Sequence, residues 1–453
     1  MKSLFIFRRD FRLTDNLGFI KCYMESDEII PIFIFTPEQA EKDKNKYFSN
    51  NAFQFMIESL EELDNDIRDK TKNKSHLHYY YGDNITVLQD INYNYNTIYF
   101  NMDYTVYARK RDNDISIFCK EQNINCFMIE DYLLLPINSY LKEDGSPYQK
   151  YTPFKNNAKK INVSHSHAKH TEYKKLSKIN SSKFKFPEYV KNPNVITHGG
   201  RKNALDILKN IKIFSHYDKE RNNLITPTTH MSSYIKFGCV SIREVYEKFK
   251  INQTLIDQLY WREFYYYLAY YIPRVLEGKS LKEKYDKIKW KNDPKIFKAW
   301  TLGMTGFPSV DAGMRELNET GFMHNRARLI TSGILIKILN CDWRLGEKYF
   351  AQKLSDYDPI VNNGNWQWSS GSGADSQPYF RILSPWKQAI DNDPECLYIK
   401  KWIPELRDIP NKDILHWDET YMKYKISYPK PIVDYKFMRE EIIKIYKEGF
   451  NYI

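Results

Sequence analysis

The first third of the chain alternates short apolar runs with segments of helical periodicity. The apolar runs predict strands at residues 3–9, 28–35, 77–83, 97–104 and 125–131. Helical patterns lie between them, around residues 51–68 and 106–121. Strands that alternate with helices predict a parallel, doubly wound sheet. We therefore expect a Rossmann-like α/β domain at the N-terminus.

The rest of the chain has a different pattern. Residues 156–185 are polar and Lys-rich and include HSHAKH at 165–170, which suits an exposed linker, a metal site or a localisation signal. We take this stretch as the connector. From Gly199 to about Lys401 the patterns are mostly helical, and a short, irregular end follows. The predicted divisions are an α/β domain at 1–135, a connector at 136–198 and an all-α domain at 199–453.

Composition narrows the class of protein. A chain of 453 residues suits two domains, and a net charge of +11 favours a polyanionic partner such as nucleic acid, although scattered lysines give the same total. Six cysteines without a CxxC pair or metal-like spacing predict free thiols and no metal site. No apolar run resembles a signal peptide or approaches the ~20 residues of a membrane span. We expect a soluble, intracellular protein of the cytoplasm or nucleus.

Two tryptophans in the C-terminal half are candidates for chemistry. Trp366 and Trp368 flank one glutamine after the turn-prone stretch 362–365. An indole can stack on a flat ring, donate a hydrogen bond and be oxidised by one electron. Aromatic residues at this spacing are also common as core filler in a helix.

Polar residues that share helix faces give further candidates. Gln258, Trp261 and Arg262 lie at i, i+3 and i+4, so they can read a base edge, stack on it and hold a phosphate. An amphipathic helix with a buried indole and a surface ion pair explains the same pattern. The hydroxyl-rich stretch 226–233 can bind a diphosphate, or it can cap a helix.

A second helix carries a similar set. Asn325, Arg328 and Leu329 share a face, and Arg326 is offset from it. A buried arginine must be paired, and the acids nearest in sequence are Asp356 and Asp358. A structural ion pair would account for this set equally well.

These separate signals meet in one family. YDKER, TTHMSSYIKFG, QLYWREFYYYL, GFMHNR, DWRLGEKYF, VNNGNWQW and IKKWIPELRDIP occur in the order found in cryptochromes and photolyases. The chain resembles that family from RRDFRLTDN to Pro410, and it is most similar to class I cyclobutane pyrimidine dimer photolyases. The resemblance implies FAD, bound in the helical domain, and light-driven repair of double-stranded DNA that carries UV-induced pyrimidine dimers, by a monomer.

The resemblance also implies roles for individual residues. FAD contacts are expected from Tyr217, Thr228, Thr229, His230, Met231, Ser232, Arg328, Asp356, Tyr357 and Asp358, with Asn362 beside flavin N5. Electron transfer to the flavin is expected through Trp366, Trp343 and Trp290. DNA or lesion contacts are expected from Arg221, Gln258, Trp261, Arg262, Asn325, Arg326, Leu329, Trp368 and Gln388.

Two of these positions depart from the pattern of dimer photolyases. Gln258 stands where many such enzymes have Glu, and Leu329 replaces a common Met. Gln258 is shared with (6-4) photolyases, but those enzymes carry two histidines at the positions of Asn325 and Leu329. The alternatives are thus (6-4) repair and a blue-light photoreceptor of the cryptochrome type.

A second chromophore is also implied. In this family an antenna of folate, deazaflavin or flavin type lies in the N-terminal domain. Asp10, Arg12, Asp103 and Arg109 lie at or near predicted strand ends, where doubly wound sheets bind ligands. An interdomain ion-pair network is the alternative for the same residues.

Overall fold

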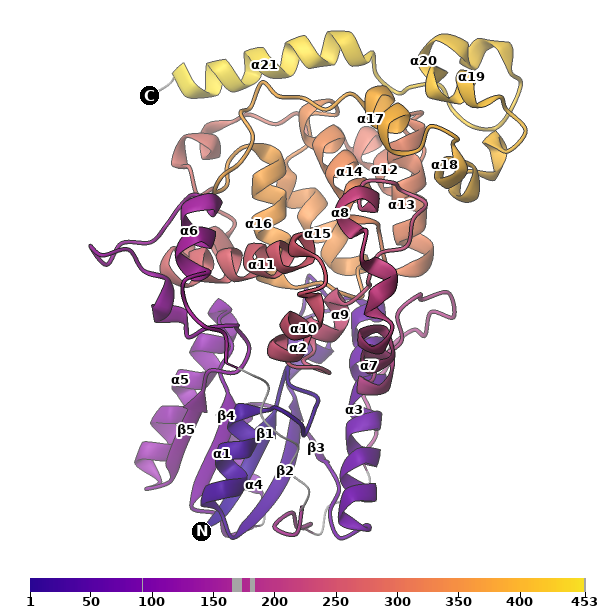
Figure 1. Cartoon of the computed structure of the whole chain (residues 1–453). Coiled ribbons are helices and arrows are strands. Elements are labelled where there is room, and N and C mark those ends of the chain that lie inside the picture. The colour runs from indigo at the N-terminus through magenta and orange to yellow at the C-terminus, as the bar shows by residue number, and fades with distance from the viewer. Residues whose placement is uncertain (92, 165–172, 180–183, 452–453) are drawn as a thin grey trace.

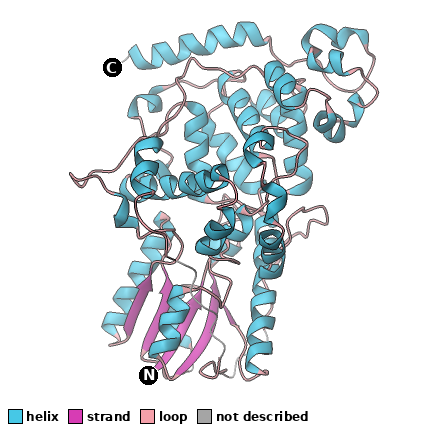
Figure 2. Cartoon of the chain, viewed as in Figure 1, coloured by secondary structure: helices cyan, strands magenta, loops and turns pink. Residues whose placement is uncertain are grey.

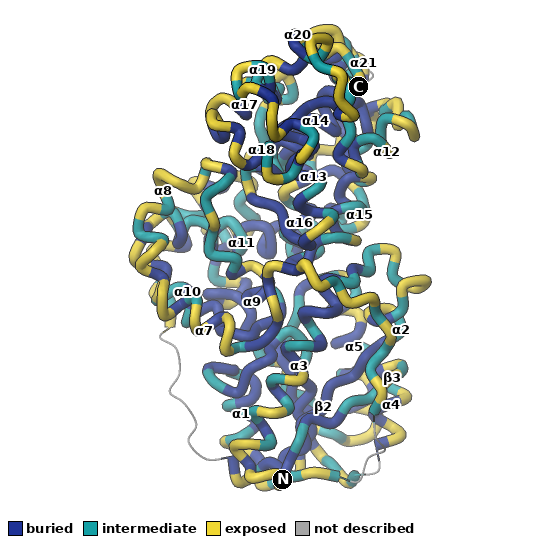
Figure 3. The backbone as a smooth tube through the Cα atoms, turned by 90° about the vertical axis from the view of Figure 1, so that its right-hand side faces the viewer, coloured by how far each residue is buried: buried dark blue, intermediate teal, exposed yellow. Residues whose placement is uncertain are grey.

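The computed structural model describes residues 1–91, 93–164, 173–179 and 184–451. A sheet with flanking helices forms one end of the molecule, and a larger, all-helical part is stacked on it (Figure 1). Buried segments run without interruption from the sheet into the helices (Figure 3). None of the helices among the described residues is both long and apolar enough to span a membrane.

Five parallel strands form the sheet in the order β3-β2-β1-β4-β5 (Figure 2). They are β1 (Lys2–Phe7), β2 (Glu28–Phe35), β3 (His78–Tyr81), β4 (Thr97–Asn101) and β5 (Asn125–Ile129). One face is covered by α1 (Leu17–Glu25) and α3 (Asn50–Thr71), and the other by α4 (Asn84–Asp90) and α5 (Val106–Glu121). Burial on both faces explains why the strands read as continuous apolar runs. The predicted doubly wound fold is confirmed.

The connector region is partly packed against both parts. The connector contains the 3-10 helix η1 (Ile137–Tyr140) and the helix α6 (Tyr151–Ala158). The short helix α2 (Pro37–Ala40) belongs to the sheet part. Tyr151, Phe154 and Ala158 form a buried face on α6, because residues three and four apart lie together on a helix. Farther on, Leu176 forms a parallel bridge with Ile29 of β2. Residues 165–170, considered as a metal site or signal, lie outside the described residues.

The helical part begins with α7 and contains its own apolar core. Its elements are α7 (Arg201–Lys209), η2 (Ile211–Phe214), α8 (Tyr217–Glu220), α9 (Ser232–Lys236), α10 (Ile242–Phe249), α11 (Gln253–Tyr271), η3 (Pro273–Glu277), η4 (Glu283–Lys287), α12 (Pro294–Leu302), α13 (Pro308–Thr320), α14 (Asn325–Lys337), α15 (Trp343–Lys353), α16 (Pro359–Ser370), α17 (Pro385–Asn392), α18 (Leu397–Trp402), η5 (Pro404–Leu406), α19 (Asn411–Leu415), α20 (Trp417–Thr420), η6 (Tyr421–Lys423) and α21 (Tyr435–Asn451). The core contains residues of α12 to α16, including Trp300 and Trp366. The expected all-α domain is confirmed.

The C-terminal end differs from the expectation of irregular structure. It finishes in α21, which lies across the helical part at the end farthest from the sheet (Figure 1). Ile442 and Tyr446, four residues apart, are buried against Tyr285 and Ile288. This apolar face within a Lys- and Glu-rich sequence is what holds the segment as a helix.

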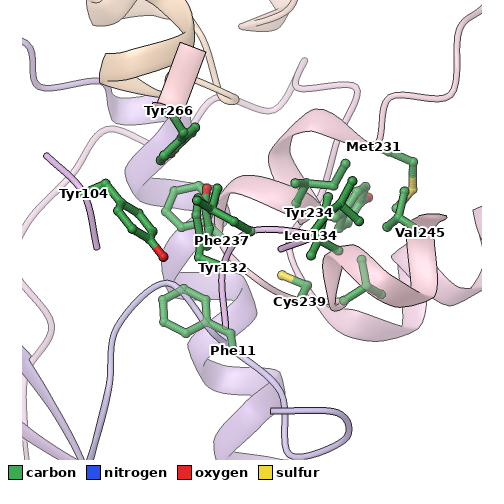
Figure 4. Packing of buried hydrophobic residues seen from close by; sticks show 14 of the residues in the cluster. Phe11, Tyr104, Tyr132, Leu134, Met231, Tyr234, Phe237, Cys239, Val245 and Tyr266 are labelled. Atoms are coloured by element: carbon green, nitrogen blue, oxygen red, sulfur yellow. The ribbon is translucent and has the colours of Figure 1, made fainter. Parts of the chain in front are cut away.

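The two parts are joined by aromatic packing and a buried ion-pair network. Phe11 stacks on Phe237, with ring centroids 6.0 Å apart, and Tyr132 packs on Tyr266 (Figure 4). Beside these rings, Arg12 and Arg243 both pair with Asp131, and Arg243 also pairs with Asp15. All four of these charged side chains are buried. Because removing one partner would leave a buried charge unpaired, the network fixes the parts relative to each other.

Candidate functional site

Ser232, Arg328 and Asp356 meet at the centre of the expected FAD site. Ser232 begins α9, Arg328 lies on α14 and Asp356 precedes α16. The Ser232 hydroxyl donates to Asp356 Oδ2 at 2.6 Å, and Arg328 Nη2 donates to the same oxygen at 2.9 Å. Burial opposes ionisation of Asp356, but the charge and hydrogen bond of Arg328 outweigh it, so its pKa lies below the ordinary 3.8. Three segments far apart in sequence thus form one charged cluster.

Unpartnered atoms beside this cluster suit a bound dinucleotide. Asp356 Oδ1 and His230 Nδ1 are buried and have no hydrogen-bond partner among the described residues. His230 has a left-handed backbone, with φ of 51°, and its ring lies 4.4 Å from that of Phe322. Buried polar atoms normally have a protein, water or ligand partner. Sugar hydroxyls of FAD would supply donors for Asp356, so the residues present fit this cofactor.

The other expected FAD contacts frame the cluster. Tyr217 opens α8, and Thr228, Thr229 and Met231 lie in the segment before α9. This segment makes no side-chain cap hydrogen bond at the start of α9. The Thr229 hydroxyl accepts a long hydrogen bond, 3.4 Å, from the Met231 N–H just before the helix. The side chain of Thr228 is half-buried and lies in the same segment.

Helix α16 extends across the stretch expected to be a turn. Residues 362–365 are helical because Asp358 caps the helix through the N–H groups of Ile360 and Val361 and Pro359 occupies its first turn. Asp358 Oδ2 pairs with Arg9 of the sheet domain at 2.5 Å. The carboxylate expected to contact FAD is therefore also committed to capping and to the domain junction.

Asn362 is held by helix α15. Its Nδ2 donates to the backbone oxygen of Glu347 at 3.1 Å, and the neighbouring Asn363 donates to Glu347 Oε1 at 3.0 Å. Burial raises the pKa of Glu347 to about 7, although the hydrogen bond from Asn363 acts in the opposite direction. The position and orientation of Asn362 thus depend on α15 as well as on its own helix.

The three expected electron-transfer tryptophans lie along connected segments. Trp366 and Trp343 are buried, and Trp366 lies against α15 so closely that a Cβ at Gly346 would be 2.1 Å from its Cη2 atom. Gly346 is about one helical turn from Trp343. Asp342 N–H donates to the Asn292 side chain at 2.7 Å, which ties the segment after Trp290 to the start of α15.

Trp290, the outermost of the three tryptophans, is partly covered by the C-terminal helix α21. Trp290 is half-buried, and Tyr446 of α21 contacts it with ring centroids 5.8 Å apart. Trp366 also contacts Trp300, whose ring centroid is 6.3 Å away.

The expected lesion-binding residues come from α11 and α16. The two helices approach so closely that a Cβ at Gly364 would lie 2.3 Å from Tyr265. Trp261 and Trp368, each half-buried, lie one helical turn from this contact. Trp261 stacks on Tyr151 of the connector, with centroids 3.7 Å apart and planes 8° apart. Stacked aromatic rings of this kind give a flat, rigid wall.

Two polar residues on α11 differ in orientation. Gln258 is half-buried and its amide makes only a long bond, 3.4 Å, to the backbone oxygen of Thr254. Arg262 instead points into the domain junction, where it donates to Glu263 Oε1 at 2.8 Å and to the backbone oxygen of Tyr132 at 3.0 Å. The expectation that Arg262 joins Gln258 and Trp261 on a DNA-facing surface does not match this placement, because burial of Glu263 requires its charge.

The remaining DNA candidates are accessible. Arg221 and Asn325 are exposed, and Arg326, Leu329 and Gln388 are half-buried. Arg326 donates to the Asn222 side chain, and its Nε has no partner among the described residues. The charge of Arg221, after burial, lowers the pKa of Arg326. These two guanidinium groups are therefore neighbours on the rim of α8 and α14.

A cavity of about 430 Å³ lies between the sheet and the helical part. It opens at the carboxyl ends of β1, β2 and β4 and is lined by residues of both parts, including Phe33, Tyr107, Lys236 and Tyr357. Asp103 lines it as expected for the antenna site. Asp10 and Arg12 instead belong to the buried networks of the junction, and Arg109 donates to the Tyr270 backbone.

Sequence reasoning missed several residues of these sites. Arg9, Lys236 and Glu347 line the cavity, and Tyr151 forms a wall beside Trp261. Arg9 and Lys236 lie within the quoted motifs RRDFR and SSYIKFG, so their presence was visible. Their roles were not, because each depends on a partner more than 90 residues away.

Comparisons with known proteins agree with this arrangement. Residues 3–173 match a family model described as DNA photolyase, and residues 255–448 match the FAD binding domain of DNA photolyase. The chain is 33% identical to a deoxyribodipyrimidine photo-lyase of Buchnera aphidicola, over 99% of this chain and 97% of the relative.

Solved structures give the same result. An archaeal photolyase from Sulfolobus tokodaii, described with two FAD molecules, is 37% identical with a TM-score of 0.89, covering 99% of this chain and 100% of that one. A class III photolyase from Agrobacterium tumefaciens is 28% identical with a TM-score of 0.88, covering 99% of this chain and 98% of that one.

Proposed function

The chain belongs to the DNA photolyase family and splits cyclobutane pyrimidine dimers in DNA with the energy of light, and we propose which of its residues carry this reaction. The observation that supports the proposal most directly is the cluster of Ser232, Arg328 and Asp356, with an unpartnered Asp356 oxygen, inside the FAD-binding domain. Bound, reduced FAD supplies the light-absorbing group that gives one electron to the dimer and receives it back.

The protein holds this cofactor with charge and shape. Arg328 would bind the diphosphate, Asp356 and the hydroxyls of Thr228 and Thr229 would bind polar groups of the ribityl and ribose chains, and Tyr217 would close the site. Asn362 presents its amide to the flavin ring, and its hydrogen bond to α15 fixes that orientation. Such pre-arranged dipoles need no reorganisation during the reaction.

The lesion is bound between aromatic walls. Trp261, stacked on Tyr151, and Trp368 hold the flipped dimer, and Gln258 donates an amide hydrogen bond to a base carbonyl. Extruding a damaged base pair costs less than extruding an intact one, and each stacked base returns about 1–3 kcal/mol. Asn325 and Leu329 carry no imidazole for acid chemistry, which supports the cyclobutane dimer over the (6-4) product as the substrate.

Contacts with the DNA backbone come from the rim. Arg221 and Arg326 bind phosphates of the DNA backbone, whereas Arg262 holds the domain junction through Glu263. Binding should weaken with salt because phosphate contacts release counterions. We propose that the protein acts on duplex DNA as a monomer.

Electrons reach the FAD site from outside through Trp290, Trp343 and Trp366. The contact of Trp366 with α15 and the bond between Asp342 and Asn292 place the three indoles on connected segments. The interdomain cavity, which has the volume and aromatic lining of a ligand site, would hold a second, light-collecting chromophore.

A repair assay tests the proposal. Chemically reduced, FAD-loaded protein is illuminated anaerobically with duplexes that carry a cyclobutane thymine dimer or a (6-4) product, and dark samples serve as controls. We expect light-dependent loss of the cyclobutane dimer alone. Repair of the (6-4) product alone, or of neither lesion, would overturn the assigned residue roles.

A further inference from the structure

The sheet side of the interdomain cavity contains an excess of buried positive charge. Arg8, at the end of β1, and Arg111, on α5, both line the cavity, and each side chain is 8% exposed. Arg8 Nη1 and Arg111 Nε both donate to one oxygen of a single carboxylate, Asp112. Asp10 bonds the backbone of Arg8 and not its side chain: Oδ1 accepts the Arg8 N–H. Its Oδ2 accepts from the side-chain amides of Asn16 and Asn101. Two guanidinium groups therefore donate to one acid, Asp112, while Asp10 acts on Arg8 through its charge and not through a hydrogen bond to the guanidinium.

Both arginines also keep an unused donor. Arg8 Nη2 and Arg111 Nη2 are buried without a hydrogen-bond partner among the described residues. Asp112 Oδ1 lies 2.9 Å from Arg111 Nη2 but outside the direction of its N–H bonds. Burial, followed by the charge of Arg111, lowers the pKa of Arg8 to about 10, so Arg8 stays protonated at neutral pH. An unpaired buried donor is costly, and a charged one more so.

The rest of the cavity suits a flat ring. Phe33, Phe48, Phe53 and Tyr107 provide apolar lining, and the Tyr107 ring lies 5.7 Å from the Arg111 guanidinium. Toward the helical part, Tyr357 and Tyr47 are stacked with centroids 6.1 Å apart. Lys236 and Glu347 add one donor and one acceptor there. A ligand with a ring at this end and an acid group at the arginine end would pack on the aromatic lining and pair the arginine donors.

We propose that Arg8 and Arg111 form an anion-binding subsite, so that the interdomain cavity selects an aromatic ligand that carries a phosphate or carboxylate group on a short chain. This inference rests on the proposed second-chromophore site and specifies its ligand class. The planar guanidinium groups bind such oxyanions by paired N–H bonds, and the added negative charge balances the second arginine. A neutral aromatic compound would leave both donors unpaired.

Binding of matched ligand pairs to the FAD-loaded protein tests this directly. Riboflavin and riboflavin 5′-phosphate share one ring and differ in the phosphate, and a folate and its diamide share one pterin and differ in the two glutamate carboxylates. Equilibrium dialysis gives the affinity of each. We expect the acid-bearing member of at least one pair to bind roughly 10- to 100-fold more tightly, since charge-assisted hydrogen bonds contribute about 1.5–3 kcal/mol. The pair that shows the difference identifies phosphate or carboxylate.

Variants locate the effect. Arg111→Gln should remove the preference and leave the affinity for the ring alone unchanged. Because this variant leaves Arg8 and Asp112 as a balanced pair, it should not lower the unfolding temperature of the protein without a ligand in the cavity. Lys110→Gln makes the same charge change on the exposed neighbour, whose side chain is 78% exposed, and should keep the preference.

Three results would overturn the subsite: equal binding within both pairs, no binding of any probe, or an unchanged preference in Arg111→Gln. Dimer repair by each reduced protein, excited through its FAD, is measured in parallel. Repair that persists while the preference is absent would reject the subsite alone, whereas loss of repair in wild type would reject the proposed function.

Discussion

The contact between Gly346 and Trp366 allows a sharp test of how α15 positions the inner tryptophan. In Gly346→Ala the new Cβ would lie 2.1 Å from Trp366 Cη2 and 2.6 Å from Leu335 Cδ2. The indole cannot simply retreat, because Phe350 packs on it with centroids 4.9 Å apart. Such overpacking costs about 1–3 kcal/mol. Alanine in place of glycine inside a helix contributes about 1 kcal/mol in the opposite direction.

Gly333→Ala is a matched control. Gly333 lies inside α14, and a Cβ there would meet its nearest neighbour, Leu383 Cδ1, at an ordinary 3.6 Å. This variant should therefore show only the gain in helix propensity. We expect Gly346→Ala to be less stable than Gly333→Ala by about 1–3 kcal/mol in urea unfolding.

Photoreduction provides the second measurement. Gly346→Ala moves Trp366 relative to both the FAD site and Trp343, so light-driven reduction should slow, whereas Gly333→Ala should match wild type. If the two variants were equally stable and reduced at equal rates, the close packing of Trp366 on α15 would be refuted.

Three further changes separate the proposed roles. Trp366→Phe should slow photoreduction but leave repair intact after chemical reduction, and an unchanged photoreduction rate would contradict the electron path. Trp368→Ala should weaken binding to dimer-containing duplex more than to undamaged duplex in a filter-binding titration, and an equal loss on both would make Trp368 a core residue. Because the folded pKa of Asp356 lies below 3.8, its ionisation stabilises the fold above that pH and the contribution is lost as pH falls through the folded pKa. The stability difference between wild type and Asp356→Asn should therefore shrink below about pH 4, and a difference independent of pH would contradict the pairing with Arg328.

Much of the fold was visible in the sequence because it depends on local pattern. All five predicted strands and the helices at Asn50–Thr71 and Val106–Glu121 are present. The stretch 362–365 was misjudged because its Asn and Gly residues favour turns in isolation. The cap at Asp358 and the packing against Tyr265 override that preference.

The site was less accessible to sequence reasoning because it depends on distant pairs. The motifs indicated Ser232, Arg328 and Asp356, and the structure brings them into contact. Helical spacing placed Arg262 beside Trp261, but spacing cannot show that Glu263 and Tyr132 draw the guanidinium inward. The role of Tyr151 required knowing that the connector returns to α11.

The pairing of Arg9 with Asp358 has a consequence for how the protein is made. The carboxylate that caps α16 is held by a residue from the first ten of the chain, and α16 carries Asn362 and Trp366. During synthesis the N-terminal domain folds first, so it is already in place as a template when this helix emerges from the ribosome. A helical fragment translated without it should retain FAD poorly. Co-expression of the two fragments should restore retention, which absorbance of the purified complex would report.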